Sequence, residues 1–193
     1  MEKEVRMLTE TVEVREQEEG KPVIQGYALK FNRWSDTLGG WFREKILPEA
    51  LEEADANNVV ALFNHDDNLI VGRTGVNLEL EVDEIGLKYT IEPFDTTAGR
   101  DLIENVRSGL VSQSSFAMSG IESDWAEGAD GVDERTITKI SRLWDVSPVV
   151  TPAYSDTEVV VGQRSLNQLE EIKNTKREKE LLDLEFGYFK LEE

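Results

Sequence analysis

The sequence predicts a mainly β fold of the α+β class, a closed or nearly closed barrel of about seven or eight strands with a few surrounding helices and a C-terminal helical tail. Apolar and polar residues alternate in many short runs, and only two segments before residue 163 carry helix signals. From Ser165 onward the apolar spacing becomes helical. Long antiparallel sheets expose their edges unless they close, which favours a barrel.

The opening residues carry strand signals followed by a helix signal. Residues 4–14 alternate, and a second β-rich run covers 22–31 after a Glu-Glu-Gly turn, so the two predict a hairpin. Pro48 stands where a first helical turn accepts proline, with acidic residues behind it. This predicts a short helix over 48–56, which Asn57 and its neighbour end.

Strands resume after this helix. The apolar run 59–63 is typical of a buried strand. The alternating runs 76–82 and 86–92 flank turn residues and predict a second hairpin. A helix is predicted over 98–108. Possible N-cap side chains precede residue 98, apolar residues share one face of the segment, and Gly109 stands where the helix would end. The remaining predicted elements are strands at 111–121, 134–150 and 157–161 and an acidic, glycine-rich loop at 124–131.

Two domains are expected, a barrel over 1–162 and a charged amphipathic helical tail over 163–193. The tail has two interpretations. It is either a targeting or scaffold-binding helix that is later removed, or a helix that packs on the barrel or pairs with another copy.

Composition excludes several classes of protein. The 193 residues contain 21 Lys and Arg against 40 Asp and Glu, a net charge of −19, which argues against binding nucleic acid or anionic lipid. No apolar run approaches the roughly 18 residues that cross a bilayer. The absence of cysteine and the single histidine exclude disulfides, thiol catalysis and most zinc sites, so no metal or cofactor is expected.

Three side chains are candidates for catalysis. His65 follows an apolar strand into a polar loop, although a lone histidine is often a bystander. In the serine-rich run, alternation turns Ser114 inward and leaves Ser115 on the opposite face, among small and polar neighbours that a substrate could approach. Ser115 is therefore the better nucleophile candidate, although an ordinary polar strand also explains the run. A serine nucleophile needs a base, and His65 is the only imidazole.

A third group is needed to orient the imidazole. Asp145 leads, because alternation places it opposite the core face of its strand. A solvated charge on a half-exposed strand is the alternative explanation. Asp66 and Asp67, beside the histidine, are rival orienting acids.

The order of these motifs resembles the prohead maturation proteases of tailed phages, and the match runs through most of 20–160. The motifs are Gly26-Tyr27-Ala28 with Phe31-Asn32, Phe63-Asn64-His65-Asp66, Gly72-Arg73-Thr74, Arg107-Ser108-Gly109, Ser114-Ser115-Phe116, Asp145-Val146-Ser147-Pro148-Val149 and Thr151-Pro152-Ala153-Tyr154. The resemblance implies a barrel similar to herpesvirus assemblin and a serine endopeptidase with Ser115 as nucleophile, His65 as base and Asp145 as third residue. The herpesvirus relatives use a second histidine as third member, which this chain lacks.

The resemblance also implies partners and a location. The expected substrates are the major capsid protein precursor, with its scaffold segment, and the protease itself, acting inside the assembling prohead in the host cytoplasm. Activation is expected to accompany association of the protease into a homo-oligomer. The alternative function is a non-catalytic capsid assembly or scaffold module with the same barrel. An esterase is disfavoured, because the chain has no Gly-x-Ser-x-Gly motif.

Overall fold

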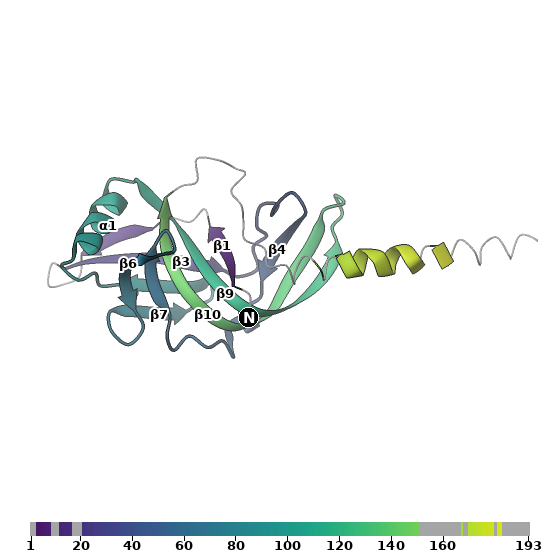
Figure 1. Ribbon diagram of the computed structural model, residues 1–193, viewed down its shortest axis with the longest axis horizontal. Helices are drawn as coiled ribbons and strands as arrows, with labels where there is room; N and C mark the ends of the chain where they lie inside the picture. Colours follow the sequence, from purple (N-terminus) through teal and green to yellow (C-terminus); the bar gives the residue numbers. More distant parts are fainter. Residues whose placement is uncertain are drawn as a thin grey trace, which may run out of the picture. The chain divides into compact units, whose positions relative to one another are not determined.

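The computed structural model describes residues 3–8, 12–16, 21–150, 167, 170–179 and 181–182. The strands among them form two sheets (Figure 1). The larger has the order β1-β9-β10-β5-β6, with β4 also paired to β10. Its strands are β1 (Glu4–Leu8), β4 (Phe42–Ile46), β5 (Val60–Phe63), β6 (Asp66–Arg73), β9 (Val111–Glu127) and β10 (Asp133–Val150).

The smaller sheet is antiparallel throughout, in the order β2-β3-β8-β7. Side chains from both sheets and from helix α1 (Thr97–Arg107) share one hydrophobic core, in which Ile24, Tyr89, Leu102, Phe116 and Val146 are buried. Burial of this apolar surface is the main driving force that holds the two sheets together. The strands of this sheet are β2 (Glu13–Glu16), β3 (Pro22–Lys30), β7 (Leu78–Val82) and β8 (Gly86–Ile91).

The predicted closed barrel of seven or eight strands is wrong. The described strands form a six-stranded and a four-stranded sheet, and β1 and β6 end the main path of the larger one. The long β9–β10 pair curves strongly (Figure 1). Register shifts along β10, including one between Leu143 and Asp145, bend and twist this pair. The sheet therefore curls without closing.

Several predicted elements are confirmed. The second hairpin forms as β7 and β8, and the helix over 98–108 forms as α1. Thr96 is its N-cap and accepts a hydrogen bond from the backbone N–H of Gly99 at 3.1 Å. Leu102, Ile103 and Val106 form its buried face.

Other predictions fail for reasons of long-range pairing. The run 4–14 is not one strand, because β1 pairs with β9 and only β2 pairs with β3. The helix over 48–56 is a single 3-10 turn, Pro48–Leu51. Its continuation is prevented because Asp55 exchanges backbone hydrogen bonds with Ser141 and Leu143 of β10.

The acidic loop begins later than predicted, since β9 continues to Glu127, and β4 and β6 were not predicted. The strand at 157–161 lies outside the described residues. The described residues at 167, 170–179 and 181–182 are helical, in agreement with the expected helix in the tail. Within the part of the chain that the structure describes, no helix is long and apolar enough to span a membrane.

Candidate active site

His65 stands on the tight connection between β5 and β6. Asn64 and His65 have φ of 54° and 58°, a left-handed conformation that costs non-glycine residues of order 1–3 kcal/mol and persists only where its surroundings impose it. Here β10 imposes it. The Asn64 N–H donates to the carbonyl of Pro148 at 3.1 Å, and the Val150 N–H donates to Asn64 Oδ1 at 3.0 Å. The connection is thereby held against the strand that carries Asp145.

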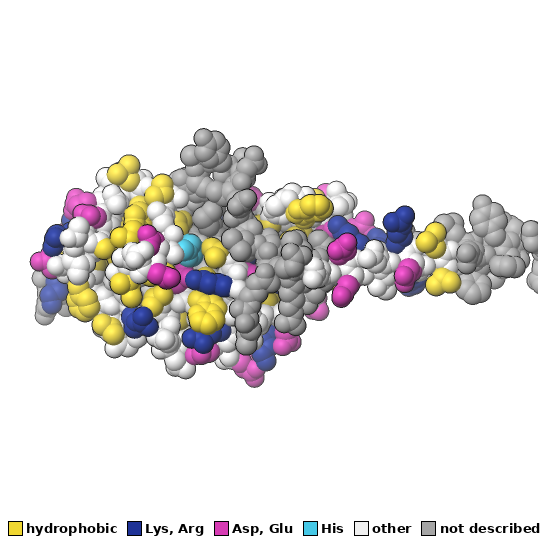
Figure 2. Space-filling model, viewed as in Figure 1, with side chains coloured by type: hydrophobic (Ala, Val, Ile, Leu, Met, Phe, Trp, Pro, Cys, Tyr) yellow, Lys and Arg dark blue, Asp and Glu magenta, His cyan; other side chains and the backbone are white. Residues whose placement is uncertain are grey.

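The imidazole bridges the two other predicted site residues. His65 Nδ1 lies 2.5 Å from Asp145 Oδ1, and His65 Nε2 lies 2.5 Å from Ser115 Oγ. The three side chains come from β9, β10 and the β5–β6 connection, so they are distant in sequence and adjacent in space. The imidazole, the only one in the chain, reaches the surface, where it is coloured cyan in Figure 2.

Asp145 is buried and negatively charged. It sits at an irregularity of β10, opposite Ala117 of β9 and Val60 of β5. Burial alone would raise the pKa of Asp145, but the hydrogen bond and charge of His65, together with the Lys3 ammonium, outweigh it and hold that pKa below its ordinary value. The alternative explanation, a solvated charge on a half-exposed strand, is therefore wrong, because the Asp145 side chain is buried.

Both oxygens of the Asp145 carboxylate have neighbours. The Ser147 hydroxyl donates to Oδ1 at 2.9 Å and lies 3.3 Å from His65 Nδ1. Lys3 Nζ forms an ion pair with Oδ2 at 2.6 Å. Sequence reasoning missed both residues. Strand alternation could have found Ser147, two positions after Asp145, whereas nothing local marks Lys3.

Ser115 is closed off from solvent. It lies opposite Met7 of β1 and Ser147 of β10, and none of it is exposed. Its hydroxyl donates to the backbone carbonyl of Arg6 at 2.7 Å. The prediction that a substrate can approach the Ser115 hydroxyl directly is therefore wrong for this structure, because β1 lies along the face to which Ser115 points.

Ser114 faces inward as predicted and helps to fix β9. Its Oγ lies 2.7 Å from the hydroxyl of the fully buried Tyr89, whose pKa is raised by burial. Gly26 permits this contact, since a Cβ there would lie 2.6 Å from the Tyr89 hydroxyl oxygen. The hydrogen bond between the Ser114 and Tyr89 hydroxyls therefore fixes the segment of β9 that carries Ser115.

The rival acids lie apart from this arrangement. Asp66 is exposed and accepts hydrogen bonds from the backbone and side chain of Asn68 at 2.8 and 2.9 Å. Asp67 is also exposed. Among the described residues, no group of three or more histidine or acidic side chains is arranged to hold a metal ion.

The geometry matches the chain of acid, imidazole and hydroxyl that serine hydrolases use. An ionised carboxylate accepts the Nδ1 proton, which leaves Nε2 as a base facing the hydroxyl. Similar constellations occur on unrelated folds, so geometry alone does not identify the family.

Comparison with known proteins identifies the family. The chain is similar to the bacteriophage T4 capsid assembly protease gp21, at 14% identity and a TM-score of 0.47 over 78% of this chain and 100% of that one. No curated protein matches the sequence. Residues 10–173 match the model of the caudovirus prohead serine proteases, which is most of the chain. The chain belongs to the caudovirus prohead serine protease family.

Proposed function

We propose that this phage prohead serine protease is an endopeptidase in which Ser115 is the nucleophile, His65 the general base and Asp145 the orienting acid. The single observation that supports these roles is the placement of the three side chains, with His65 Nδ1 2.5 Å from Asp145 Oδ1 and His65 Nε2 2.5 Å from Ser115 Oγ. Its substrates are the major capsid protein precursor, within the scaffold segment, and the protease itself. It acts inside the assembling prohead, in the host cytoplasm, as a homo-oligomer.

The reaction follows from the positions of the three groups. Ser115 Oγ attacks the carbonyl carbon of the cleaved peptide bond while His65 Nε2 takes its proton. The C–N bond breaks, the imidazolium gives the proton to the leaving amine, and an acyl-enzyme remains. A water molecule then attacks the acyl carbon while His65 takes its proton; the bond from that carbon to Ser115 Oγ breaks, and the imidazolium gives the proton to Ser115 Oγ. Asp145 stays ionised and stabilises the imidazolium.

The test is intact mass over time. Wild-type protein and Ser115→Ala are each incubated alone and with the matching capsid precursor assembled into shells. Fragments from the wild type, absent with Ser115→Ala, are expected and locate the cleaved bonds. If both proteins and the precursor remain intact in assembled shells, the endopeptidase proposal is refuted and the non-catalytic assembly module replaces it.

We also propose that residues 163–193 direct the protease into the prohead and are removed by self-cleavage. A chain that ends at Val161 separates the two interpretations of the tail. If the shortened chain folds and cleaves but is absent from proheads, the tail is a targeting element. Loss of folding, measured by circular dichroism, would instead mean that the tail packs on the first domain or on another copy.

A further inference from the structure

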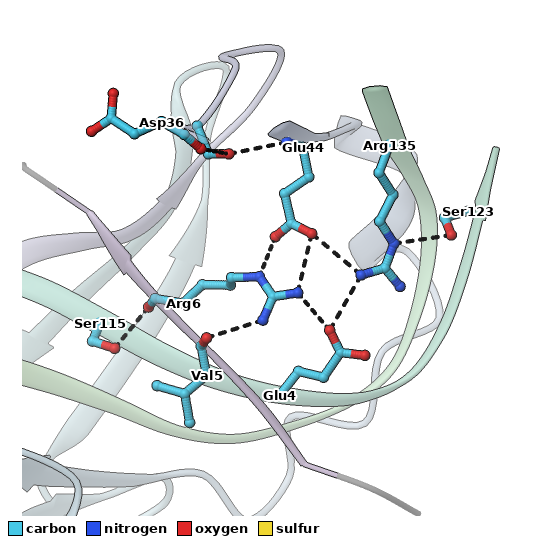
Figure 3. Close-up of polar contacts among 9 residues, drawn as sticks. Glu4, Val5, Arg6, Asp36, Glu44, Ser115, Ser123 and Arg135 are labelled. Carbon is cyan, nitrogen blue, oxygen red and sulfur yellow. Dashed lines mark hydrogen bonds and ion pairs between the residues drawn. The ribbon is translucent and has the colours of Figure 1, made fainter. Parts of the chain in front are cut away.

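Strand β1 covers the proposed catalytic groups. It is an antiparallel neighbour of β9, with Met7 opposite Ser115, and it ends the path of the larger sheet. The carbonyl of Arg6 accepts the Ser115 hydroxyl at 2.7 Å, and Lys3 pairs with Asp145. Figure 3 shows the Arg6 backbone beside Ser115, with the Arg6 side chain extending away from it. One short strand therefore contacts both the nucleophile and the acid.

The hydroxyl of Ser115 has one proton and two acceptors. With Asp145 accepting the Nδ1 proton, a neutral His65 presents Nε2 as an acceptor, and the Arg6 carbonyl is the second. A proton donated to the carbonyl cannot also be donated to the base. The docked strand thus holds the hydroxyl in an unreactive hydrogen bond. Because β1 lies along the face to which Ser115 points, another peptide reaches that face only after β1 has left.

The side chain of Arg6 is held in a buried acidic site. Its Nε and Nη2 donate to the two carboxylate oxygens of Glu44 on β4, the second at 3.1 Å, and Nη2 also lies 2.5 Å from Glu4 Oε2 (Figure 3). Burial alone would lower the pKa of Arg6, but the two carboxylates outweigh it and raise that pKa. A paired fork of this kind favours arginine over lysine.

Glu4, Arg6, Glu44 and Arg135 form a cluster of two acidic and two basic side chains. Another strand can replace β1 without leaving this cluster with a net charge. Arg135 of β10, fully buried, lies 3.2 Å from Glu4 Oε2 and 3.3 Å from Glu44 Oε2. Glu4 and Arg6 belong to β1, Glu44 belongs to β4 and Arg135 belongs to β10. When β1 leaves, one acid and one base leave with it, and a neutral Glu44–Arg135 pair stays. An incoming strand with the pattern Glu-x-Arg restores all four charges.

We propose that the strip along β9 that β1 occupies is the substrate site, and that Glu44 selects an arginine at the residue whose carbonyl faces Ser115. The substrate is an extended peptide that adds to β9 as an antiparallel strand, and β1 is a built-in competitor for that position. Arg135 favours an acidic residue two positions before the arginine. This inference rests on the proposed function.

The first experiment measures the rate at which a fluorophosphonate labels Ser115 in the full chain. Arg6→Ala removes the buried anchor of β1 and is expected to label at least about 10-fold faster than wild type, since hydrogen bonds to charged groups contribute on this scale. Arg15→Ala, an exposed change on β2, is the matched control and keeps the wild-type rate. Arg6→Lys keeps the charge and replaces Arg6→Ala if that variant does not fold. Equal rates for wild type and the Arg6 variant overturn the occupancy of the site by β1.

The second experiment measures selectivity with two peptides, Lys-Glu-Val-Arg and Lys-Glu-Val-norleucine, each joined to a fluorogenic amine. Wild type is expected to prefer the arginine peptide by about 10- to 100-fold in kcat/KM, and Glu44→Gln, with nearly the same shape, is expected to lose most of that preference. Equal cleavage of both peptides by wild type overturns the selectivity while the proposed function stands. Absence of Ser115 labelling and of cleavage in every variant refutes the proposed function itself.

Discussion

Replacing Asp145 by asparagine tests the electrostatic role of this side chain in the proposed mechanism. The change keeps the shape and one acceptor oxygen but removes the charge beside His65 Nδ1, which lies 2.5 Å from Asp145 Oδ1. Because Lys3 also pairs with Asp145, the comparison is made in a Lys3→Ala parent. That parent has no ammonium at Oδ2, so the loss of the Lys3 ion pair does not contribute to the measured difference.

The magnitude follows from the charge pair that forms during the reaction. Charge centres about 4 Å apart at an effective dielectric constant of about 20 attract by about 4 kcal/mol. At about 1.4 kcal/mol per decade of rate, losing this attraction slows acylation of Ser115 by about 10³-fold. An asparagine amide can also donate toward Nδ1 and favour the wrong tautomer of His65, which adds to the loss.

The assay is the second-order rate of Ser115 labelling by a fluorophosphonate, followed by intact mass. Ser147→Ala is the matched control, because it removes one hydrogen bond to the same Asp145 oxygen and keeps the charge of the carboxylate. It is expected to cost about 10- to 100-fold, less than the loss expected for Asp145→Asn. A loss below about 10-fold for Asp145→Asn, with an unchanged circular dichroism spectrum, would refute the orienting role. An unlabelled Lys3→Ala parent would refute the serine mechanism.

Three further results are expected. Gly26→Ala places a methyl group 2.6 Å from the Tyr89 hydroxyl oxygen and should lower the free energy of unfolding by about 1–3 kcal/mol, measured by urea denaturation. Arg135→Met leaves Glu44 without its partner on β10 and should cost about 3–5 kcal/mol; a midpoint of urea unfolding equal to wild type would contradict this. The pKa of Asp145 is lower in the folded protein than in the unfolded chain. Asp145 therefore adds to the free energy of unfolding at pH values above its unfolded-state pKa, and this contribution is lost as the pH falls through its folded-state pKa. Asp145→Asn should therefore flatten the acid limb of a stability-against-pH profile.

Local sequence signals located several elements and the residues that meet in the candidate site. The β7–β8 hairpin and α1 follow from short-range periodicity, turn residues and the Thr96 cap, which act within a few residues. His65, Ser115 and Asp145 stood out because their residue types suit one reaction, and the structure brings their side chains within hydrogen-bonding distance. Their catalytic roles remain predictions.

The sequence by itself determined the strand-rich composition, the inward face of Ser114 and the restriction of imidazole chemistry to His65. Only the tertiary structure decided that the sheet curls without closing, that Asp145 is buried at an irregularity of β10, and that β1 lies across Ser115. Ser115 and Arg6 are 109 positions apart, and no local pattern specifies such a pairing. Strand partners are chosen by the apolar surface and charge that their pairing buries, a property of the whole fold.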